Sequence, residues 1–260
     1  MNCLLFGGHL EVLRRMLFRV CGLAACVALF VFCFKEETFK LLLAPSEWDF
    51  VTYRWIERVI RYCGGGFHFE EFHVDLIATE LSSQFMTHVT TAIYLGLLGA
   101  SPYIVYELFR FVSPALYENE KKYSVQVVSV VYSLFIIGIL MSYYVLFPVS
   151  FRFLGTYSVA ESVRSTITLD SYISTFVTLS LLMGVVFQLP VIAFFLAKMG
   201  IVNSRMLSTY RRHAFLAILI ISAVITPPDI LTLVLVAIPL YLLYEISIWI
   251  IRRVEKPKKA

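Results

Sequence analysis

The sequence predicts an all-α polytopic membrane protein with six transmembrane helices and both termini on the cytoplasmic or matrix side. Of its 260 residues, 59% are hydrophobic and 15% are charged, and the mean hydropathy is +0.80. A soluble domain is about half apolar and about a quarter charged. The apolar residues also occur in long blocks, which is typical of chains that cross a bilayer several times. The predicted spans are residues 17–34, 85–112, 125–154, 172–197, 214–226 and 230–251.

The first span, residues 17–34, is interpreted as a retained helix. Its basic flank resembles the start of a signal peptide, but the apolar run is long and no small-residue cleavage site clearly follows. The connection after it, residues 35–84, is the longest in the chain. We expect a turn at Pro45 and an amphipathic helix around residues 50–62 in this connection.

The second and third spans are joined by an inner connection in which acidic and basic residues are balanced. Its sequence with the preceding helix end is SPYIVYELFRFVSPALYENEKK. Glu118 and Glu120 stand at the predicted water edge, and Glu11 lies on the same side. Carboxylates in this position suit a guanidinium ligand, whose planar fork matches a carboxylate. A solvated loop paired with Lys121 and Lys122 is the alternative.

The fourth span contains a predicted break. Pro190 removes a backbone hydrogen bond in the segment GVVFQLP, so the helix should kink there. The Gln188 amide lies roughly 15 Å of helix before Lys198, near the bilayer centre. A lone amide at this depth either forms an interhelical hydrogen bond that fixes packing or takes part in function.

The fifth and sixth spans form the C-terminal pair. Residues 214–226 make roughly 20 Å of helix, which is short for a hydrocarbon core of about 30 Å. Asp229 follows two prolines and is expected to cap the last helix. Glu245 lies inside the last span, and its expected partner is Arg252, seven residues on, in a snorkelling ion pair.

The charge distribution sets the predicted orientation. Most of the 22 Lys and Arg residues lie in the N-terminal segment, in the connections after the second and fourth spans, and in the C-terminal tail. Most acidic residues lie on the other side. By the positive-inside rule both termini face the cytoplasm or matrix. The net charge of +4 is therefore a feature of topology and gives no sign of nucleic-acid binding.

The residues point to transport or binding rather than catalysis. The sequence has no Ser/His/Asp set, no HExxH and no nucleotide-binding motif, and its five histidines are scattered. We therefore expect no enzyme activity, no cofactor and no metal. One alternative is a small-solute or ion transporter that uses Glu107, Gln188 and Glu245, with Arg110 as a partner for Glu107. Another is a structural subunit of a respiratory-chain complex.

Five segments, taken in order, resemble those of a known family. They are HLEVLRRML, Ala44-Pro45, SPYIVYELFRFVSPALYENEK, GVVFQLPVIAFFLAKMGI, and ITPPD followed by AIPLYLLYEISI. On these segments the chain resembles TatC, the multispanning receptor subunit of the twin-arginine protein translocase, over nearly its full length. The resemblance implies one membrane domain, residues 1–260, that binds the twin-arginine signal peptide of a folded cargo at the inner face. It also implies that the cargo then crosses an energised membrane.

The resemblance further implies which residues act. Glu120 falls on the loop glutamate that the family uses for the arginine pair, and Lys121 replaces the arginine that usually follows it. The residues expected at the signal-peptide site are Glu120, Glu118, Glu11, Phe111, Pro114, Tyr117 and Lys121. The positions expected for transport or partner contact are Pro45, Gln188, Thr226 and Asp229.

The partners implied by the resemblance are other proteins and the lipid around the chain. They are twin-arginine precursor proteins, small single-span subunits of the TatA/TatB type, and further copies of the same chain. No nucleic acid is expected.

Three positions depart from the family pattern, and they bear on location. The N-terminal pattern is usually HLxELRxRL, but here Val12 takes the place of the glutamate. The acid is Glu11, about 100° away on a regular helix, so it can take over only where the helix is irregular or rotated. Gln188 stands where a glutamate is common, and Leu233 where a polar residue often helps to bind the small partner. These changes, with 22 Phe and 15 Tyr residues, favour a mitochondria-encoded member in the mitochondrial inner membrane. The bacterial cytoplasmic membrane or the plastid thylakoid is the alternative.

Overall fold

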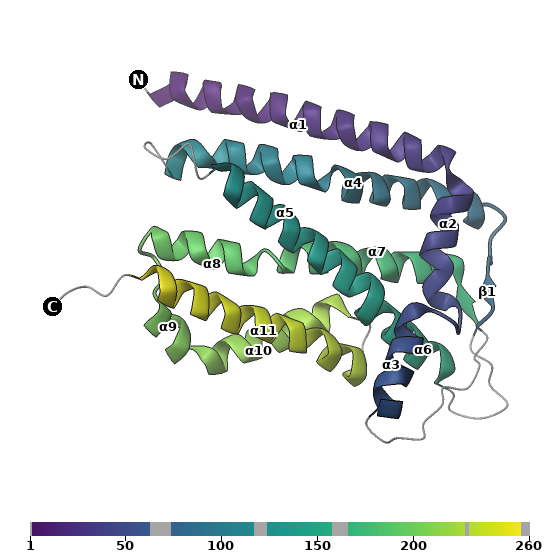
Figure 1. The fold of residues 1–260 in the computed structure, drawn as a ribbon. Helices are drawn as coiled ribbons and strands as arrows, with labels where there is room; N and C mark the ends of the chain where they lie inside the picture. Colours follow the sequence, from purple (N-terminus) through teal and green to yellow (C-terminus); the bar gives the residue numbers. More distant parts are fainter. Residues whose placement is uncertain (1, 63–73, 117–123, 158–165, 227–228, 256–260) are drawn as a thin grey trace. The chain divides into compact units, whose positions relative to one another are not determined.

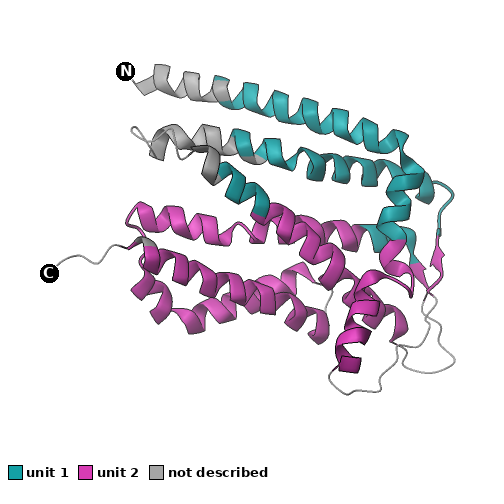
Figure 2. Cartoon of the chain, viewed as in Figure 1, with its two compact units in different colours: residues 1–43, 78–133, 168–173 teal, residues 44–77, 134–167, 174–260 magenta. Residues whose placement is uncertain are grey.

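The structure is a computed structural model that describes residues 2–62, 74–116, 124–157, 166–226 and 229–255. Helices dominate this part of the chain (Figure 1), which confirms the all-α prediction. Two short strands, β1 (Leu76–Ile77) and β2 (Ile167–Thr168), form a two-stranded sheet. The chain divides into two compact units (Figure 2). Unit 1 comprises Met1–Leu43, Ala78–Ser133 and Thr168–Ile173, and unit 2 comprises Ala44–Ile77, Leu134–Ile167 and Ser174–Ala260.

Unit 1 is organised around two long helices that lie side by side, α1 and α4 (Figure 1). Gly96 of α4 allows the close approach, because a Cβ there would lie 2.6 Å from the Cβ of Ala28 and 2.8 Å from the carbonyl oxygen of Ala24. Small residues at helix interfaces are typical of membrane proteins, where backbones pack closely. The helices of unit 1 are α1 (Asn2–Cys33), α2 (Lys35–Leu43), α4 (Ser83–Leu116) and the first part of α5 (Ser124–Met141).

Unit 2 is built around α11, which packs against α8, α9 and α10. Its core contains fully buried apolar side chains such as Phe147, Met183 and Leu240. Gly138 lets α5 approach α7, because a Cβ there would stand 2.6 Å from the carbonyl oxygen of Met183. The elements of unit 2, which also includes the rest of α5, are η1 (Ala44–Ser46), α3 (Val51–Tyr62), the π-helical turn η3 (Ser142–Leu146), α6 (Phe147–Thr156), most of α7 (Leu169–Val186), α8 (Leu189–Lys198), α9 (Ser204–Thr209), α10 (Arg211–Ile225) and α11 (Ile230–Val254).

Four helical stretches among the described residues are long and apolar enough to cross a bilayer, and the chain is an integral membrane protein. They coincide with the first, third, fourth and sixth predicted spans. Of the other two, α4 covers the second, and α10, with 15 residues, is short as expected for the fifth. The four stretches are Leu13–Cys33, Val128–Thr156, Leu169–Lys198 and Ile230–Arg253.

Local predictions within the helices are largely confirmed. The fourth span breaks between Val186, the end of α7, and Leu189, the start of α8, with Pro190 in the first turn of α8. The amphipathic helix expected around residues 50–62 is α3. The sequence did not predict α2, β1 or β2, because short polar segments carry too few periods of a pattern to be recognised.

Candidate functional site

A buried carboxylate lies in the half of unit 1 that holds the start of α1 and the end of α4. The Glu107 side chain is 6% exposed, and its Oε1 accepts a hydrogen bond of 2.7 Å from the Tyr103 hydroxyl. The same oxygen lies 3.5 Å from Nη1 of Arg19 on α1, whose side chain is 55% exposed. A buried charge is costly unless it is paired and hydrogen-bonded. Tyr103 and Arg19 thus supply the hydrogen bond and the counter-charge that the buried carboxyl group needs.

The partner of Glu107 among the described side chains is Arg19 on α1, whereas the sequence spacing suggested Arg110 on the same helix. Arg110 is on the same helix, and its side chain lies outside the described residues, so that pair stays a prediction. The sequence does contain a sign of this pair, because Arg19 is a cation within an otherwise apolar span and such a residue needs a counter-charge.

Glu11 is exposed and already has a partner. Its Oε1 accepts a hydrogen bond of 2.7 Å from Nη2 of Arg15, four residues on, and both side chains are more than half exposed. Exposed pairs at this spacing contribute only about 0.3–0.5 kcal/mol, so another guanidinium can replace Arg15 at low cost. α1 is a single α-helix from Asn2 to Cys33. The irregularity that would turn Glu11 toward the direction of the Val12 side chain is therefore not found in α1.

The other residues of the predicted binding site have no described side chains. Tyr117, Glu118, Glu120 and Lys121 lie outside the described residues. Phe111 and Pro114 are part of α4, and the structure describes only their backbone there. The binding site at these residues stays a prediction.

Pro45 is buried in η1, and a tyrosine that the sequence did not single out holds it. The Tyr53 hydroxyl lies 3.1 Å from the carbonyl oxygen of Pro45 and 2.9 Å from that of Pro148, so one O–H group is shared between two acceptors. Burial raises the pKa of Tyr53 well above its usual range, and the charge of Arg152, 5.2 Å from the ring centroid, opposes this shift. The hydroxyl therefore stays protonated at neutral pH and links η1 to α6.

Gln188 lies in the break between α7 and α8. Its Nε2 donates to the carbonyl oxygen of Gly184 at 3.4 Å, a contact within the same span. The aromatic ring of Phe135 packs against Gly184, since a Cβ there would lie 2.7 Å from a ring carbon. The amide thus takes up a backbone acceptor at the kink, close to the point where α5 and α7 pack together.

Asp229 caps α11, as predicted. Its Oδ1 accepts a hydrogen bond of 2.7 Å from the backbone N–H of Thr232, and the Thr232 hydroxyl donates to Oδ2. Thr226 caps its own helix end differently, since its hydroxyl donates to the carbonyl oxygen of Ser222 at 2.9 Å. An apolar cavity of about 780 Å³ lies beside Asp229, between the end of α6 and the first turns of α11.

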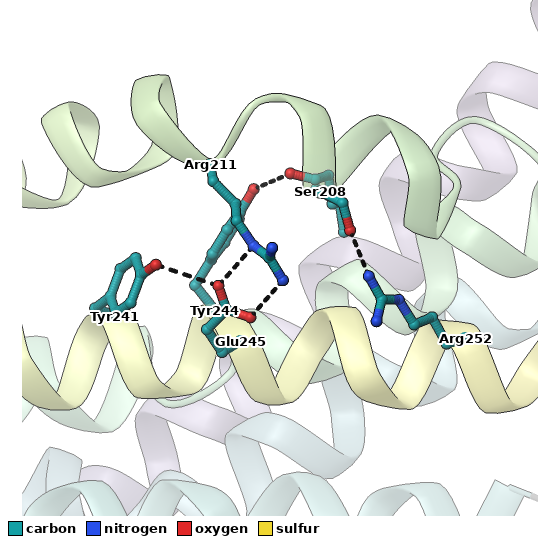
Figure 3. Close-up of polar contacts among 7 residues, drawn as sticks. Ser208, Arg211, Tyr241, Tyr244, Glu245 and Arg252 are labelled. Atoms are coloured by element: carbon teal, nitrogen blue, oxygen red, sulfur yellow. Dashed lines mark hydrogen bonds and ion pairs between the residues drawn. The ribbon is translucent and has the colours of Figure 1, made fainter.

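The expected pair between Glu245 and Arg252 is wrong. Arg211, at the start of α10, holds Glu245 instead, with Nε 2.8 Å from Oε1 and Nη2 donating to Oε2 at 2.9 Å (Figure 3). The Tyr241 hydroxyl donates to Oε1 at 3.2 Å. Arg252 donates to Ser208 at 2.9 Å. Spacing on one helix suggested Arg252, whereas the packing of α10 on α11 brings Arg211 closer.

Further polar contacts fasten α9 to α11. The Tyr244 hydroxyl donates to the carbonyl oxygen of Leu207 at 2.7 Å (Figure 3). Glu255 accepts a hydrogen bond of 2.8 Å from the backbone N–H of Ser204 and another from its hydroxyl. Together with the Arg252 contact, they place polar links along the C-terminal half of α11. This arrangement holds helix ends in place and shows no catalytic geometry among the described residues.

Comparisons with known proteins agree with one another. A family model described as Sec-independent protein translocase protein (TatC) matches residues 8–239. Sec-independent protein translocase protein TatC of Blattabacterium sp. subsp. Periplaneta americana (strain BPLAN) is 33% identical over 257 residues, 97% of this chain and 97% of that protein. Sec-independent protein translocase protein TatCy of Bacillus subtilis (strain 168) is 38% identical over 181 residues, 70% of this chain and 71% of that protein.

Solved structures give the same picture. A crystal structure of the twin-arginine translocase receptor TatC in DDM matches with a TM-score of 0.75 and 28% identity, covering 94% of this chain and 99% of that chain. A second crystal structure of a twin-arginine translocase receptor TatC has a TM-score of 0.74 and also 28% identity, covering 95% of this chain and 100% of that chain. The two relatives named above are bacterial, which matches the bacterial alternative and gives no support to the mitochondrial location.

Proposed function

We propose that this chain, which belongs to the Sec-independent protein translocase (TatC) family, is the receptor for twin-arginine signal peptides and the core of a translocase for folded proteins. The observation that carries the proposal is the likeness to a solved twin-arginine translocase receptor over 94% of the chain. The translocase works across an energised membrane. Family membership favours this function over the solute-transporter and respiratory-subunit alternatives, and we assign the chain no enzymatic reaction.

Glu120 is the residue that we propose binds the arginine pair of the signal peptide. Glu118 and Glu11 add negative charge, and Lys121 flanks the site. Phe111, Pro114 and Tyr117 form its framework. Two facts support a carboxylate site here: guanidinium groups fit carboxylates bidentately, and Glu11 is exposed, with the weak, exchangeable Arg15 as its partner among the described side chains.

A second set of positions is proposed to act in transport or in contact with partners. Pro45 and Asp229 are anchored, one by Tyr53 and the other by its capping bonds, so the backbone at both positions is held in place. Thr226 precedes Asp229 at the end of α10, and Gln188 marks the kink in the fourth span. The partners are twin-arginine precursors, small single-span subunits of the TatA/TatB type and further copies of this chain.

The proposed topology is one membrane domain, residues 1–260, with six spans and both termini on the inner side. The four apolar stretches described above support it, as do the length of α4 and the place of α10 between α9 and α11. The membrane that we favour is the bacterial cytoplasmic membrane, since the relatives named above are bacterial, with the mitochondrial inner membrane or the plastid thylakoid as the alternatives.

Glu120→Ala tests this proposal. The variant should insert normally but should cross-link much less to a twin-arginine precursor, because the main carboxylate for the guanidinium groups is lost. The measurement is site-specific cross-linking in membranes that contain matched amounts of the protein. Glu80→Ala, which removes an exposed acid of the 35–84 connection, is the matched control and should keep normal cross-linking. Undiminished precursor binding by Glu120→Ala would remove Glu120 from the site.

A further inference from the structure

The ion pairs Arg211–Glu245 and Arg19–Glu107 each join an arginine to a partly or fully buried glutamate, and their geometries differ. Arg211 approaches Glu245 with two contacts of 2.8 and 2.9 Å, one to each carboxylate oxygen. Arg19 approaches Glu107 with a single contact of 3.5 Å, to the oxygen that Tyr103 already occupies. A bidentate fork of short bonds is the strong form of this interaction. Arg19 is therefore a weak partner for a carboxylate that needs a strong one.

The burial of the two side chains shows which of them can move. Glu107 is 6% exposed and is held in place by the Tyr103 hydroxyl, whereas the side chain of Arg19 is 55% exposed. Arg19 can leave by rotation of its own side chain, with no change in the packing of α1 on α4. Among the described side chains, the Tyr103 hydroxyl would then be the group that still contacts the Glu107 carboxylate.

We propose that Glu107 is a second guanidinium-binding site, which Arg19 occupies at rest and which takes an arginine side chain of the cargo in exchange. The proposal rests on the function proposed above and deepens it. Arginine is the fitting ligand, because its guanidinium is planar, weakly hydrated and always charged, whereas the compact ammonium of lysine loses more hydration on burial. The single negative charge of the buried carboxylate is also neutralised by the single positive charge of one guanidinium.

The position of Glu107 along α4 assigns it a step after the loop site. It lies nine residues before Leu116, the end of α4, which is roughly 14 Å of helix. A signal peptide that begins to lie along α4 therefore meets the loop residues first and Glu107 later. The exchange forms no covalent bond and moves no proton, since one guanidinium replaces another.

The experiment measures the Kd of a fluorescent twin-arginine signal peptide for the full-length protein in lipid nanodiscs. Arg19→Gln removes the internal competitor and should lower the Kd about threefold or more. The reason is that Glu107 is then unoccupied, and able to bind the peptide, in most molecules. Glu107→Gln should weaken binding, and the double variant should bind like Glu107→Gln alone. A twin-lysine peptide should gain nothing from Arg19→Gln. Tyr106→Phe, at an exposed tyrosine of the same helix, keeps both charges and the Tyr103 hydroxyl, so it is the matched control and should bind the peptide like the wild type.

Each outcome bears on the inference. The inference is overturned if Arg19→Gln binds the peptide as weakly as the wild type or more weakly while its unfolding temperature is unchanged. Should Arg19→Gln fail to fold, Arg19→Lys decides, since it keeps the charge without the fork and should still tighten binding, to a smaller extent. If neither Arg19→Gln nor Glu107→Gln changes the Kd from its wild-type value, this inference is wrong and the proposed function is unaffected. If the wild type and all variants fail to bind the twin-arginine peptide, both this inference and the proposed function are wrong.

Discussion

Two glutamates of the apolar helices, Glu245 and Glu107, find partners on neighbouring helices. Glu245 meets Arg211, 34 positions away, and Glu107 meets Arg19 across the α1–α4 interface. In both cases the sequence spacing suggested a partner on the same helix. A same-helix neighbour is the only contact that periodicity can predict, whereas side-by-side helices bring distant residues within a few ångströms. An intramembrane charge predicts the need for a partner but does not identify it.

At the same scale, Asp229→Ala tests whether the residue acts as a cap. Loss of the acceptor for the Thr232 N–H should cost about 0.5–2 kcal/mol of stability. Asp229→Asn keeps an acceptor at the same place and should remain close to the wild type. Thermal unfolding in detergent measures both. An equal loss in the two variants would show that the charge matters and that the capping bond does not.

At the scale of elements, close helix contacts depend on small residues. α1 and α4 pack where Gly96 meets Ala24 and Ala28, and α5 and α7 pack where Gly138 meets the backbone of Met183. The break between α7 and α8 has a local cause, since Pro190 removes a backbone donor, and the sequence predicted it. The helix pairs themselves follow from tertiary packing, which the apolar runs alone could not predict.

Gly96→Val should loosen the pairing of α1 with α4. The new side chain would meet the backbone of Ala24 at 2.8 Å, which cannot move aside easily, so a loss of about 1–3 kcal/mol is expected. Gly22→Val is the matched control on α1, because nothing lies within 4 Å of a Cβ there. Thermal unfolding of both variants in detergent tests the contact. A control that is as unstable as Gly96→Val would mean that helix propensity, rather than packing, sets the loss.

At the scale of the whole molecule, charge asymmetry is the main determinant of orientation. Lys and Arg gather at connections that the predicted spans place on one side, and the positive-inside rule predicts that this side faces the cytoplasm or matrix. Tertiary contacts do not enter this prediction, because insertion depends on flanking charge and on span order.

Cysteine labelling tests this orientation. In a chain whose native cysteines are replaced by serine, Glu80→Cys should react from outside with a membrane-impermeant maleimide. Arg205→Cys should react only after the membrane is permeabilised, since the connection after the fourth span faces inward. Both positions are exposed in the described structure. Labelling of position 205 in sealed, right-side-out membranes would reverse the proposed topology.

The sequence by itself determined the class, the four spans that the structure bears out, the kink at Pro190 and the cap at Asp229. These depend on hydrophobic length and on residues close in sequence, so local physics is enough. Its ordered motifs also indicated the family, which the comparisons confirmed. Only the tertiary structure decided that Arg19 faces Glu107, that Arg211 holds Glu245 and that Tyr53 anchors Pro45. The reason is that a buried polar group must be satisfied by whichever donor the packing of helices brings near it, and that choice is not encoded in spacing along one helix.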